Sequence, residues 1–345
     1  GGPPGAGIGG GSGITGSNLT IEGSAEVTAT GGTSAAGIGG GYAGGGSNIK
    51  ISGSATVTAT GGIGGAGIGG GNSGGGLNIA ISGGYVKAVA GESPSGKADP
   101  IGNGSGKQGI PGVSITGGAF PEDAVSEGKV YGVGLTSGYV LGANEDDRVD
   151  EYPHRVYSTG DFSVKGGAYG TDYEYDSNVL AIKSSTPLTI SMKDGVTDPT
   201  KDTIVTVADG ANVTLAGVNI DASKGYSTAA LFVQSGSLNL TLASGTDNFL
   251  KSGESRAGLE NGVNTLTIDG KGALEVVGGS SSAGIGFPHG SSSGDSNITI
   301  TEDVKVKAVG GQPGISEGGA GIGRGGDNLS GTSSIIISGS ATVEA

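Results

Sequence analysis

The chain has 345 residues, of which 79 are glycine, 11 are proline and none is cysteine or tryptophan. Glycine is far above its usual share of about 7%, yet no strict Gly-X-Y period runs through the chain, which excludes collagen. The absence of cysteine excludes disulfides and thiolate metal sites. The net charge of −14 argues against nucleic acid or an anionic membrane surface as a partner, because phosphate groups would be repelled.

The first ninety residues contain a repeat of 30 residues. The string Ala-Gly-Ile-Gly begins at Ala6, Ala36 and Ala66. Twelve residues later in each copy an asparagine opens a strand-like run, at Asn18, Asn48 and Asn78. A fixed period of this length is the mark of a solenoid, in which each repeat is one coil.

The second copy alternates apolar and polar residues with a period of two. Ile49, Ile51 and Val57 fall on one side of the chain, whereas Lys50 and Thr58 fall on the other. Such alternation indicates strands with one buried face, and the glycine density argues against helix. With three short strands per coil of about 30 residues, the sequence predicts an all-β fold, a right-handed parallel β-helix.

The recurring residues at the corners of this predicted coil have physical roles. Glycines such as those at 39–41 permit positive φ and leave no Cβ to collide with the next coil. The repeated asparagines fall at one corner, so we expect their amides to stack as a ladder. Like residues should therefore lie on like residues along the solenoid axis.

The middle of the chain departs from the repeat. The pattern of residues 92–112 is typical of a loop. The pattern of residues 113–158 indicates a segment that closes one solenoid. The pattern restarts near Asp161 and continues with strand-like runs at Ile204, Val213, Leu238 and Leu266. We therefore expect two domains: residues 1–158, the last coils and closing segment of one β-helix, and residues 159–345, the first part and coils of a second.

Acidic residues in the middle region suggest a calcium site, because calcium prefers hard oxygen ligands. The candidate ligands are Glu145, Asp146, Asp147, Asp150, Asp172 and Asp176. Solvated acidic loops are the alternative interpretation. No other cofactor is indicated by the sequence.

Tyrosines gather in the same region, and exposed aromatic rings are what sugar binding by stacking requires. The candidate ligand surface comprises Tyr131, Tyr139, Tyr152, Tyr173 and Tyr175. The alternative is that these rings close the end of a solenoid and pack between elements.

Catalysis is not expected from the residues available. Polysaccharide hydrolases use paired carboxylates at a defined separation, and on β-helices they add a histidine-bearing turn. The two histidines, His154 and His289, lack such surroundings, and the pair Asp146-Asp147 sits in a run of charge. We therefore predict that the protein is not an enzyme.

The two ends of the chain match neighbouring parts of the repeat. Residues 340–345 resemble 54–59, and residues 1–6 resemble 61–66. Joining the end of one copy to the start of another nearly restores the repeat. We therefore expect the chain itself to be the main partner, end to end, as a tandem module or a filament.

The succession of motifs also resembles a known family. Val213–Asp221, Leu240–Asn248, the Ala-Gly-Ile-Gly coils and the closing Ile115-Thr-Gly-Gly look like glycine-rich β-helix domains of bacterial cell-surface proteins. They resemble in particular the carbohydrate-binding-domain β-helix group. The resemblance implies an exported location at the cell surface, with adhesion or polysaccharide binding suspected and calcium bound by some relatives.

These observations predict an extracellular structural or adhesive module of a bacterial surface fibre, stalk or adhesin, able to assemble end to end. The alternative is a calcium-assisted polysaccharide-binding module, with a polysaccharide as the partner. No run of 18 apolar residues is present, so we expect no insertion into a membrane.

Overall fold

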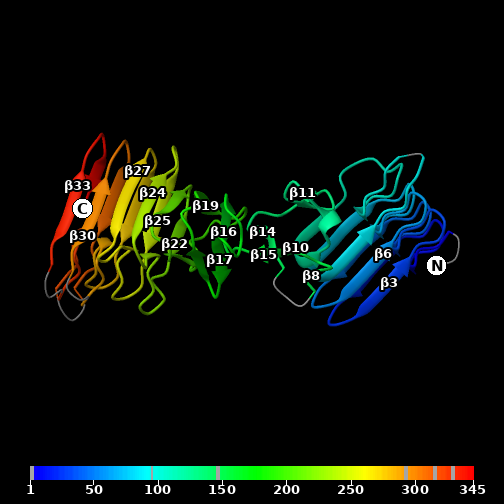
Figure 1. The fold of residues 1–345 in the computed structure, drawn as a ribbon, viewed down its shortest axis with the longest axis horizontal. Helices are drawn as coiled ribbons and strands as arrows, with labels where there is room; N and C mark the ends of the chain where they lie inside the picture. The colour runs from blue at the N-terminus through cyan, green and yellow to red at the C-terminus, as the bar shows by residue number, and fades with distance from the viewer. Residues whose placement is uncertain (1–3, 95, 145–147, 291–293, 314–316, 328–330) are drawn as a thin grey trace. The chain divides into compact units, whose positions relative to one another are not determined.

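The computed structural model describes residues 4–94, 96–144, 148–290, 294–313, 317–327 and 331–345 (Figure 1). The chain divides into two compact units, residues 1–158 and 159–345. Both are parallel β-helices, and together they contain about 10 stacked turns among the described residues. The helical structure in this part of the chain is one short 3-10 helix, η1 (Glu122–Ala124).

The coils of unit 1 have three sides, each formed by parallel strands, and two of these sides are joined in one sheet through the long strand β8. The first contains β1 (Ile8–Gly9), β4 (Ile38–Gly39), β7 (Ile68–Gly69) and β9 (Ile101–Gly102). The second contains β2 (Gly16–Ile21), β5 (Gly46–Ile51), the first half of β8 (Gly76–Val89) and β10 (Val113–Phe120). The third contains β3 (Glu26–Thr30), β6 (Thr56–Thr60) and the second half of β8.

Equivalent residues of successive coils lie side by side, as the period predicts. Ile38 pairs in register with Ile68, and Ile49 pairs with Ile79. All four side chains are buried, whereas Lys50 on the other face of β5 is exposed. The predicted parallel β-helix with stacked aliphatic columns is therefore confirmed.

The Ile-Gly corner shows why glycine is required there. Gly39 has a φ of +132°, and a Cβ on it would collide with the carbonyl oxygen of Gly69 in the next coil. Gly9 meets Gly39 in the same way. Close backbone stacking and a positive φ together exclude any larger residue at this position.

The segment 92–112 is not wholly a loop, and the prediction is wrong at β9. Ile101 is fully buried and pairs with Ile68. This two-residue strand repeats the Ile-Gly pair of the earlier corners, and Gly102 has the same φ of +137° as Gly69. Its distance along the chain from Ile68 departs from the 30-residue period, which hid it in the sequence.

The remainder of unit 1 closes the solenoid with antiparallel strands. β15 (His154–Ser158) pairs antiparallel with β10 and with β14 (Tyr139–Ala143). A small antiparallel sheet contains β11 (Val125–Ser126), β12 (Lys129–Val130) and β13 (Val133–Gly134). The parallel stacking of coils therefore stops at β10.

Unit 2 also has three sheets, which contain the following strands. The first contains β16 (Phe162–Lys165), β19 (Leu188–Met192), β21 (Ala211–Leu215), β24 (Ser237–Leu242), β27 (Thr265–Gly270), β30 (Ser296–Ile300) and β33 (Ser333–Ile337). The second contains β17 (Tyr173–Asp176), β18 (Val179–Ile182), β20 (Thr203–Thr206), β23 (Leu231–Val233), β26 (Leu259–Glu260), β29 (Ile285–Gly286) and β32 (Ile322–Gly323). The third contains β22 (Asn219–Asp221), β25 (Asp247–Lys251), β28 (Ala273–Val277), β31 (Lys305–Val309) and β34 (Thr342–Glu344).

Unit 2 opens with antiparallel pairs and then becomes wholly parallel. β16 runs antiparallel to β19, and β17 runs antiparallel to β18. From β19 and β18 onward each strand pairs in parallel with its equivalent one coil later, ending at β33, β32 and β34. The two units thus have antiparallel strands at the end of the first and at the start of the second.

Candidate functional site

Two of the predicted tyrosines fasten the closing segment of unit 1 to its coils. The hydroxyl of Tyr131 donates to the carbonyl oxygen of Val86 (3.2 Å) and accepts from the backbone N–H of Ala88 (2.8 Å). Tyr152 is fully buried, and its ring meets Tyr85 edge-on with centroids 5.4 Å apart. Burial raises the pKa of both phenols, so both remain protonated at neutral pH.

The other three tyrosines are also engaged within their own units. Tyr139 packs partly buried against the aliphatic core of unit 1. Tyr173 is buried, which raises its pKa to about 12, and the hydroxyl of Tyr175 lies 2.9 Å from Oδ2 of Asp202 and donates to it. Burial leaves Tyr152 and Tyr173 no open ring face on which a sugar could stack.

The carboxylate of Asp172 is occupied by three donors from its own surroundings. It accepts from Oγ of Ser184 (2.6 Å), Oγ1 of Thr186 (2.8 Å) and the backbone N–H of Ala168 (2.7 Å). These hydrogen bonds to the ionised form, led by that of Ser184, hold the pKa of Asp172 below its usual range. The arrangement ties a loop of unit 2 together.

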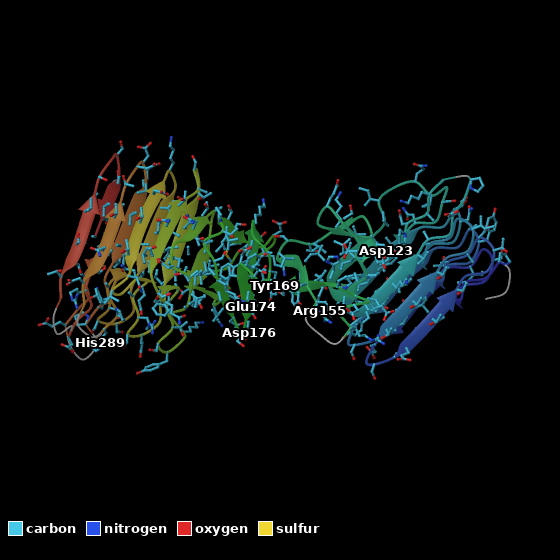
Figure 2. The ribbon with its side chains drawn as sticks, in the orientation of Figure 1. Asp123, Arg155, Tyr169, Glu174, Asp176 and His289 are labelled. Atoms are coloured by element: carbon cyan, nitrogen blue, oxygen red, sulfur yellow. The ribbon has the colours of Figure 1, made fainter. Side chains whose placement is uncertain are left out.

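The other candidate calcium ligands do not converge in the described part of the chain. Asp176 accepts from Oγ of the adjacent Ser177 (3.1 Å), and Glu174 pairs with Lys183 at 3.0 Å; Figure 2 labels both acids. Asp150 is exposed in a turn. Within the described residues no three His, Cys, Asp or Glu side chains come together as a metal site. The candidates Glu145, Asp146 and Asp147 lie outside the described residues.

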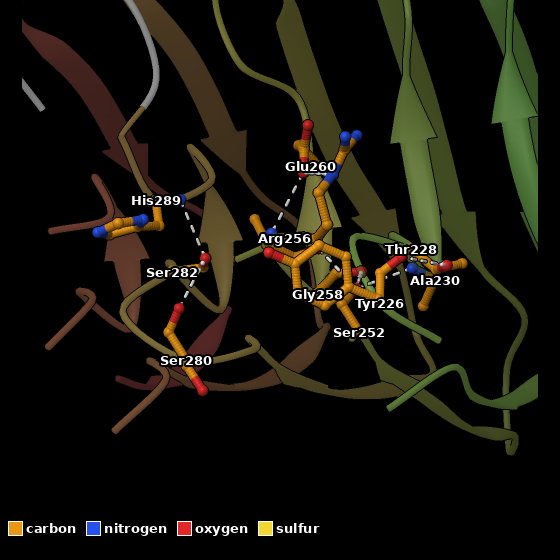
Figure 3. A network of polar contacts seen from close by, with 11 residues as sticks. Tyr226, Thr228, Ala230, Ser252, Arg256, Gly258, Glu260, Ser280, Ser282 and His289 are labelled. Atoms are coloured by element: carbon orange, nitrogen blue, oxygen red, sulfur yellow. Dashed lines mark hydrogen bonds and ion pairs between the residues drawn. The ribbon is translucent and has the colours of Figure 1, made fainter. Parts of the chain in front are cut away.

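Each histidine meets one carboxylate. Nε2 of His154 lies 2.8 Å from Oε2 of Glu122 in unit 1, and Nε2 of His289 lies 3.3 Å from Oδ2 of Asp327 in unit 2. Both pairs join neighbouring loops or strand ends, and the backbone N–H of His289 donates to Oγ of Ser282 (3.0 Å, Figure 3).

An ion pair in unit 2 with a buried carboxylate and a half-buried arginine was not predicted from the sequence. Nε of Arg256 donates to Oε2 of Glu260 at 2.7 Å (Figure 3), and the backbone N–H of Ala257 donates to the same oxygen at 3.2 Å. Burial raises the pKa of Glu260, and the positive charge of Arg256 opposes that shift. The guanidinium also lies 5.0 Å above the ring of Phe232. In the sequence, the pair is indicated only by the four-residue spacing of Arg256 and Glu260.

A polar corner lies next to this pair. Oγ of Ser252 donates to the carbonyl oxygen of Ala257 (2.7 Å) and accepts from the backbone N–H of Ala230 (2.8 Å); Figure 3 labels Ser252 and Ala230. A buried hydroxyl therefore satisfies backbone groups of two coils where the chain turns.

The predicted asparagine ladder is present in unit 1. Nδ2 of Asn48 donates to Oδ1 of Asn18 (3.0 Å), and Nδ2 of Asn78 donates to Oδ1 of Asn48 (2.7 Å). All three residues have φ between 52° and 57°, a left-handed conformation that asparagine tolerates better than most residues. Unit 2 has a similar step, in which Nδ2 of Asn239 donates to Oδ1 of Asn212 (3.0 Å).

The outer face of the third sheet of unit 2 is hollowed into a groove of about 760 Å³. It crosses β22, β25, β28, β31 and β34, and it contains the half-buried ring of Phe249. Asn219 and Glu275 flank this ring in register on neighbouring coils, and Glu275 pairs with Lys307 at 2.9 Å. The aromatic ring of Phe249, with amide and charged groups beside it, forms a surface on which a polar ligand chain can lie.

Two coils leave their inner residues uncovered. Ile335 and Ile337 on β33 occupy core positions but are 39% and 51% exposed. Ile8 on β1 is 38% exposed, although its equivalent Ile38 is fully buried. Within the described residues, each of these two coils pairs with one neighbouring coil.

Comparisons with known proteins give no relative: no family model, no curated protein and no solved structure matches the chain. Among the described residues, no helix is long and apolar enough to cross a membrane. The class defined by the fold is therefore the parallel β-helices, and function must be argued from this chain alone.

Proposed function

We propose that the chain is a structural or adhesive β-helical module of a bacterial surface fibre, stalk or adhesin, without catalytic activity. The observation that carries this proposal is the continuous stacking of coils in each unit. Columns such as Ile38–Ile68–Ile101 keep every coil against its neighbours through buried aliphatic contact and parallel backbone pairing.

Stacking of this kind supports a mechanical role. Bending or opening a coil breaks backbone hydrogen bonds on three sheets at once, and it also exposes the inner side chains. The amide ladder of Asn18, Asn48 and Asn78 adds polar links along the axis. Each unit should therefore resist deformation and proteolysis over its length.

Two measurements test the proposal. Limited proteolysis of the full chain should cut exposed loops such as 106–110 and spare the stacked strands. Rapid cleavage within β5 or β24 would contradict a rigid module. Antibody against the chain should label intact cells of the source organism. Labelling only after the cells are permeabilised would overturn the surface location.

We propose as the second candidate a polysaccharide-binding module, supported by the groove around Phe249. A partly open ring beside Asn219 and Glu275 offers stacking together with hydrogen bonding. Calcium assistance would have to come from carboxylates that a bound chain draws together.

A glycan array with and without a chelator separates the two candidates. Binding that Phe249→Ala abolishes favours the second, and Phe232→Ala is the matched control because Phe232 lies on a different sheet beneath Arg256. A chelator effect would support the calcium component. If the chain binds no glycan on the array, the structural module remains as the sole proposal.

A further inference from the structure

A pocket of about 440 Å³ in unit 2 combines two lysines with hydroxyl and amide groups. It lies just before strands β18, β20 and β23 and crosses three successive coils. Its walls come from the turn that joins β17 to β18, from segment 201–203 and from the turn 222–228. Among the described residues that line the pocket, Lys201 and Lys224 are the only ionisable ones.

Backbone pairing brings the two lysines to the same corner of the solenoid. The backbone N–H of Asp221 donates to the carbonyl oxygen of Thr200 at 2.8 Å. Lys201 follows Thr200 directly, and Lys224 follows Asp221 by three positions in the next coil. The two ammonium groups are therefore carried by neighbouring coils and contribute to one pocket.

The charge of these two lysines is not compensated within the described part of the chain. Lys183, Lys251 and Lys307 of the same unit each pair with a carboxylate at 2.9–3.4 Å. Lys201 and Lys224 have no such partner among the described residues, although the chain has 32 acidic residues against 18 basic ones. Their positive charge is therefore available to an anion from solution.

The nearest aspartates in the sequence are engaged elsewhere. Asp176 accepts from the serine that follows it (3.1 Å), and Asp202 accepts from the hydroxyl of Tyr175 (2.9 Å). Asp221 pairs with Lys251 at 3.4 Å. None of these three carboxylates lines the pocket, so the pocket keeps its positive charge.

Thr203 adds a buried hydroxyl to the pocket. Its backbone N–H donates to the carbonyl oxygen of Asn178 (2.9 Å), which fixes the residue against the β17–β18 turn. Because Ile204 is buried in the core, Thr203 lies on the opposite, outer face of β20. Thr203 is only 4% exposed, and its hydroxyl has no hydrogen-bond partner among the described residues. A buried hydroxyl of this kind is normally satisfied by a ligand or a water molecule.

The third wall contributes a further hydroxyl, from Thr228. A Cβ on Gly225 would lie 2.6 Å from Oγ1 of Thr228, so glycine at this position leaves space for that hydroxyl. Oγ1 of Thr228 donates to the carbonyl oxygen of Tyr226 at the long distance of 3.5 Å. It can therefore turn toward a better acceptor in the pocket.

We propose that this pocket binds a tetrahedral dianionic oxyanion, phosphate or sulfate, either free or as the ester group of a small molecule. Two ammonium groups match the charge of a dianion. Lysine acts as a point charge suited to phosphate, whereas a planar carboxylate is best matched by the fork of arginine. The inference goes beyond the proposed structural role and does not depend on it.

The size of the pocket and the charge of the chain indicate a small ligand. Its volume falls within the range of about 300–1,000 Å³ that is usual for small-molecule sites. The net charge of −14 repels an extended polyanion. A small ion responds mainly to the two lysines beside it, because salt screens exposed charges farther away than about 10 Å.

Calorimetric titration of the full chain tests the proposal with defined probes. Inorganic phosphate, sulfate and glucose 6-phosphate should bind saturably, glucuronate should bind more weakly, and glucose should not bind. Tighter binding of glucose 6-phosphate than of inorganic phosphate would identify a small ester as the ligand. Equal affinities would identify the free ion.

Variants of the lysines localise the binding to the pocket. Lys201→Gln combined with Lys224→Gln should weaken phosphate binding at least about tenfold. The matched control combines Lys165→Gln with Lys271→Gln, which are exposed lysines of unit 2 that do not line the pocket. This control removes the same charge and should change the affinity by less than about twofold.

A third variant tests the buried hydroxyl. Thr203→Val keeps the shape of the side chain and should weaken binding about tenfold, the effect of losing one hydrogen bond to a charged group. Limited proteolysis checks that each variant keeps the wild-type fold.

Three results would overturn the proposal: no saturable binding of any phosphate or sulfate probe, equal losses in the two lysine pairs, or tighter binding of glucuronate than of phosphate. In each case a protease-resistant chain would leave the structural role intact, so the two proposals fail separately.

Discussion

Ile68 allows the stacked-column argument to be tested quantitatively. It is fully buried on β7, between Ile38 on one side and Ile101 on the other. The backbone N–H of Ile68 donates to the carbonyl oxygen of Pro100 at 2.9 Å, and that of Ile38 donates to Gly67 at 2.9 Å. These bonds fix the spacing of the coils, so the site cannot collapse around a smaller side chain.

Ile68→Ala should therefore lower the free energy of unfolding of unit 1 by about 3 kcal/mol, within the usual range for such truncations. Ile8→Ala is the matched control at the equivalent position of the first coil. Among the described residues, Ile8 stacks on one neighbouring coil, and it is 38% exposed. Its truncation should cost about 1 kcal/mol or less, because less apolar surface leaves water there on folding.

The assay is urea denaturation of the full chain combined with hydrogen exchange of peptides from β4, β7 and β9. Ile68→Ala should speed exchange in all three strands, since each coil is stabilised by its neighbours. Equal losses for Ile68→Ala and Ile8→Ala would refute the argument that burial between two coils decides the cost.

Four further predictions follow from single contacts. Gly39→Ala should cost more than about 3 kcal/mol because the added Cβ meets backbone at positive φ, whereas Gly11→Ala, with nothing within 4 Å, should be nearly neutral in thermal denaturation. Asn48→Gly keeps the left-handed backbone and should lose about 1 kcal/mol per amide hydrogen bond, whereas Asn48→Ala should lose a further ~1–2 kcal/mol. The pKa of Asp172 is lowered on folding, so its stabilisation is present above the unfolded pKa and is lost as pH falls through the folded one; Asp172→Asn should flatten the acid limb of a stability–pH curve. The pKa of Tyr173 is raised to about 12, so stability should fall as pH rises from 10 toward 12, and Tyr173→Phe should remove one late phenol from an ultraviolet titration.

Distinct results would contradict each of these. Equal effects of alanine at Gly39 and Gly11 would mean that the coils do not approach closely at the corner. If Asn48→Gly were neutral, the amide ladder would contribute nothing. An unchanged acid limb in the Asp172 variant, or a phenol at position 173 that titrates normally, would mean that the respective loop is open to water.

Much of the coil could be predicted from the sequence because the information is local and repeated. The 30-residue period fixes which residues become neighbours, and the period of two within each strand fixes which face is buried. Ile49 and Lys50 illustrate this, because adjacent residues took opposite faces as expected. The ladder of Asn48 with its equivalents follows from the same period.

The environment of the candidate site residues could not be predicted from the repeat. The tyrosines and acids of the middle region carry no period, so the sequence does not indicate whether Tyr152 is buried or whether Asp172 already has hydrogen-bond donors. The groove around Phe249 depends on side chains from five coils, and no single segment identifies it.

The sequence by itself determined the parallel β-helix, its inner columns and its glycine corners, because identical coils in succession must place like residues together. Only the tertiary structure decided the antiparallel strands that interrupt the stacking, the strand β9, and the pairing of Arg256 with the buried Glu260. These features arise where aperiodic segments find partners on coils already formed. Their geometry therefore depends on the shape of the solenoid rather than on any pattern within the segments themselves.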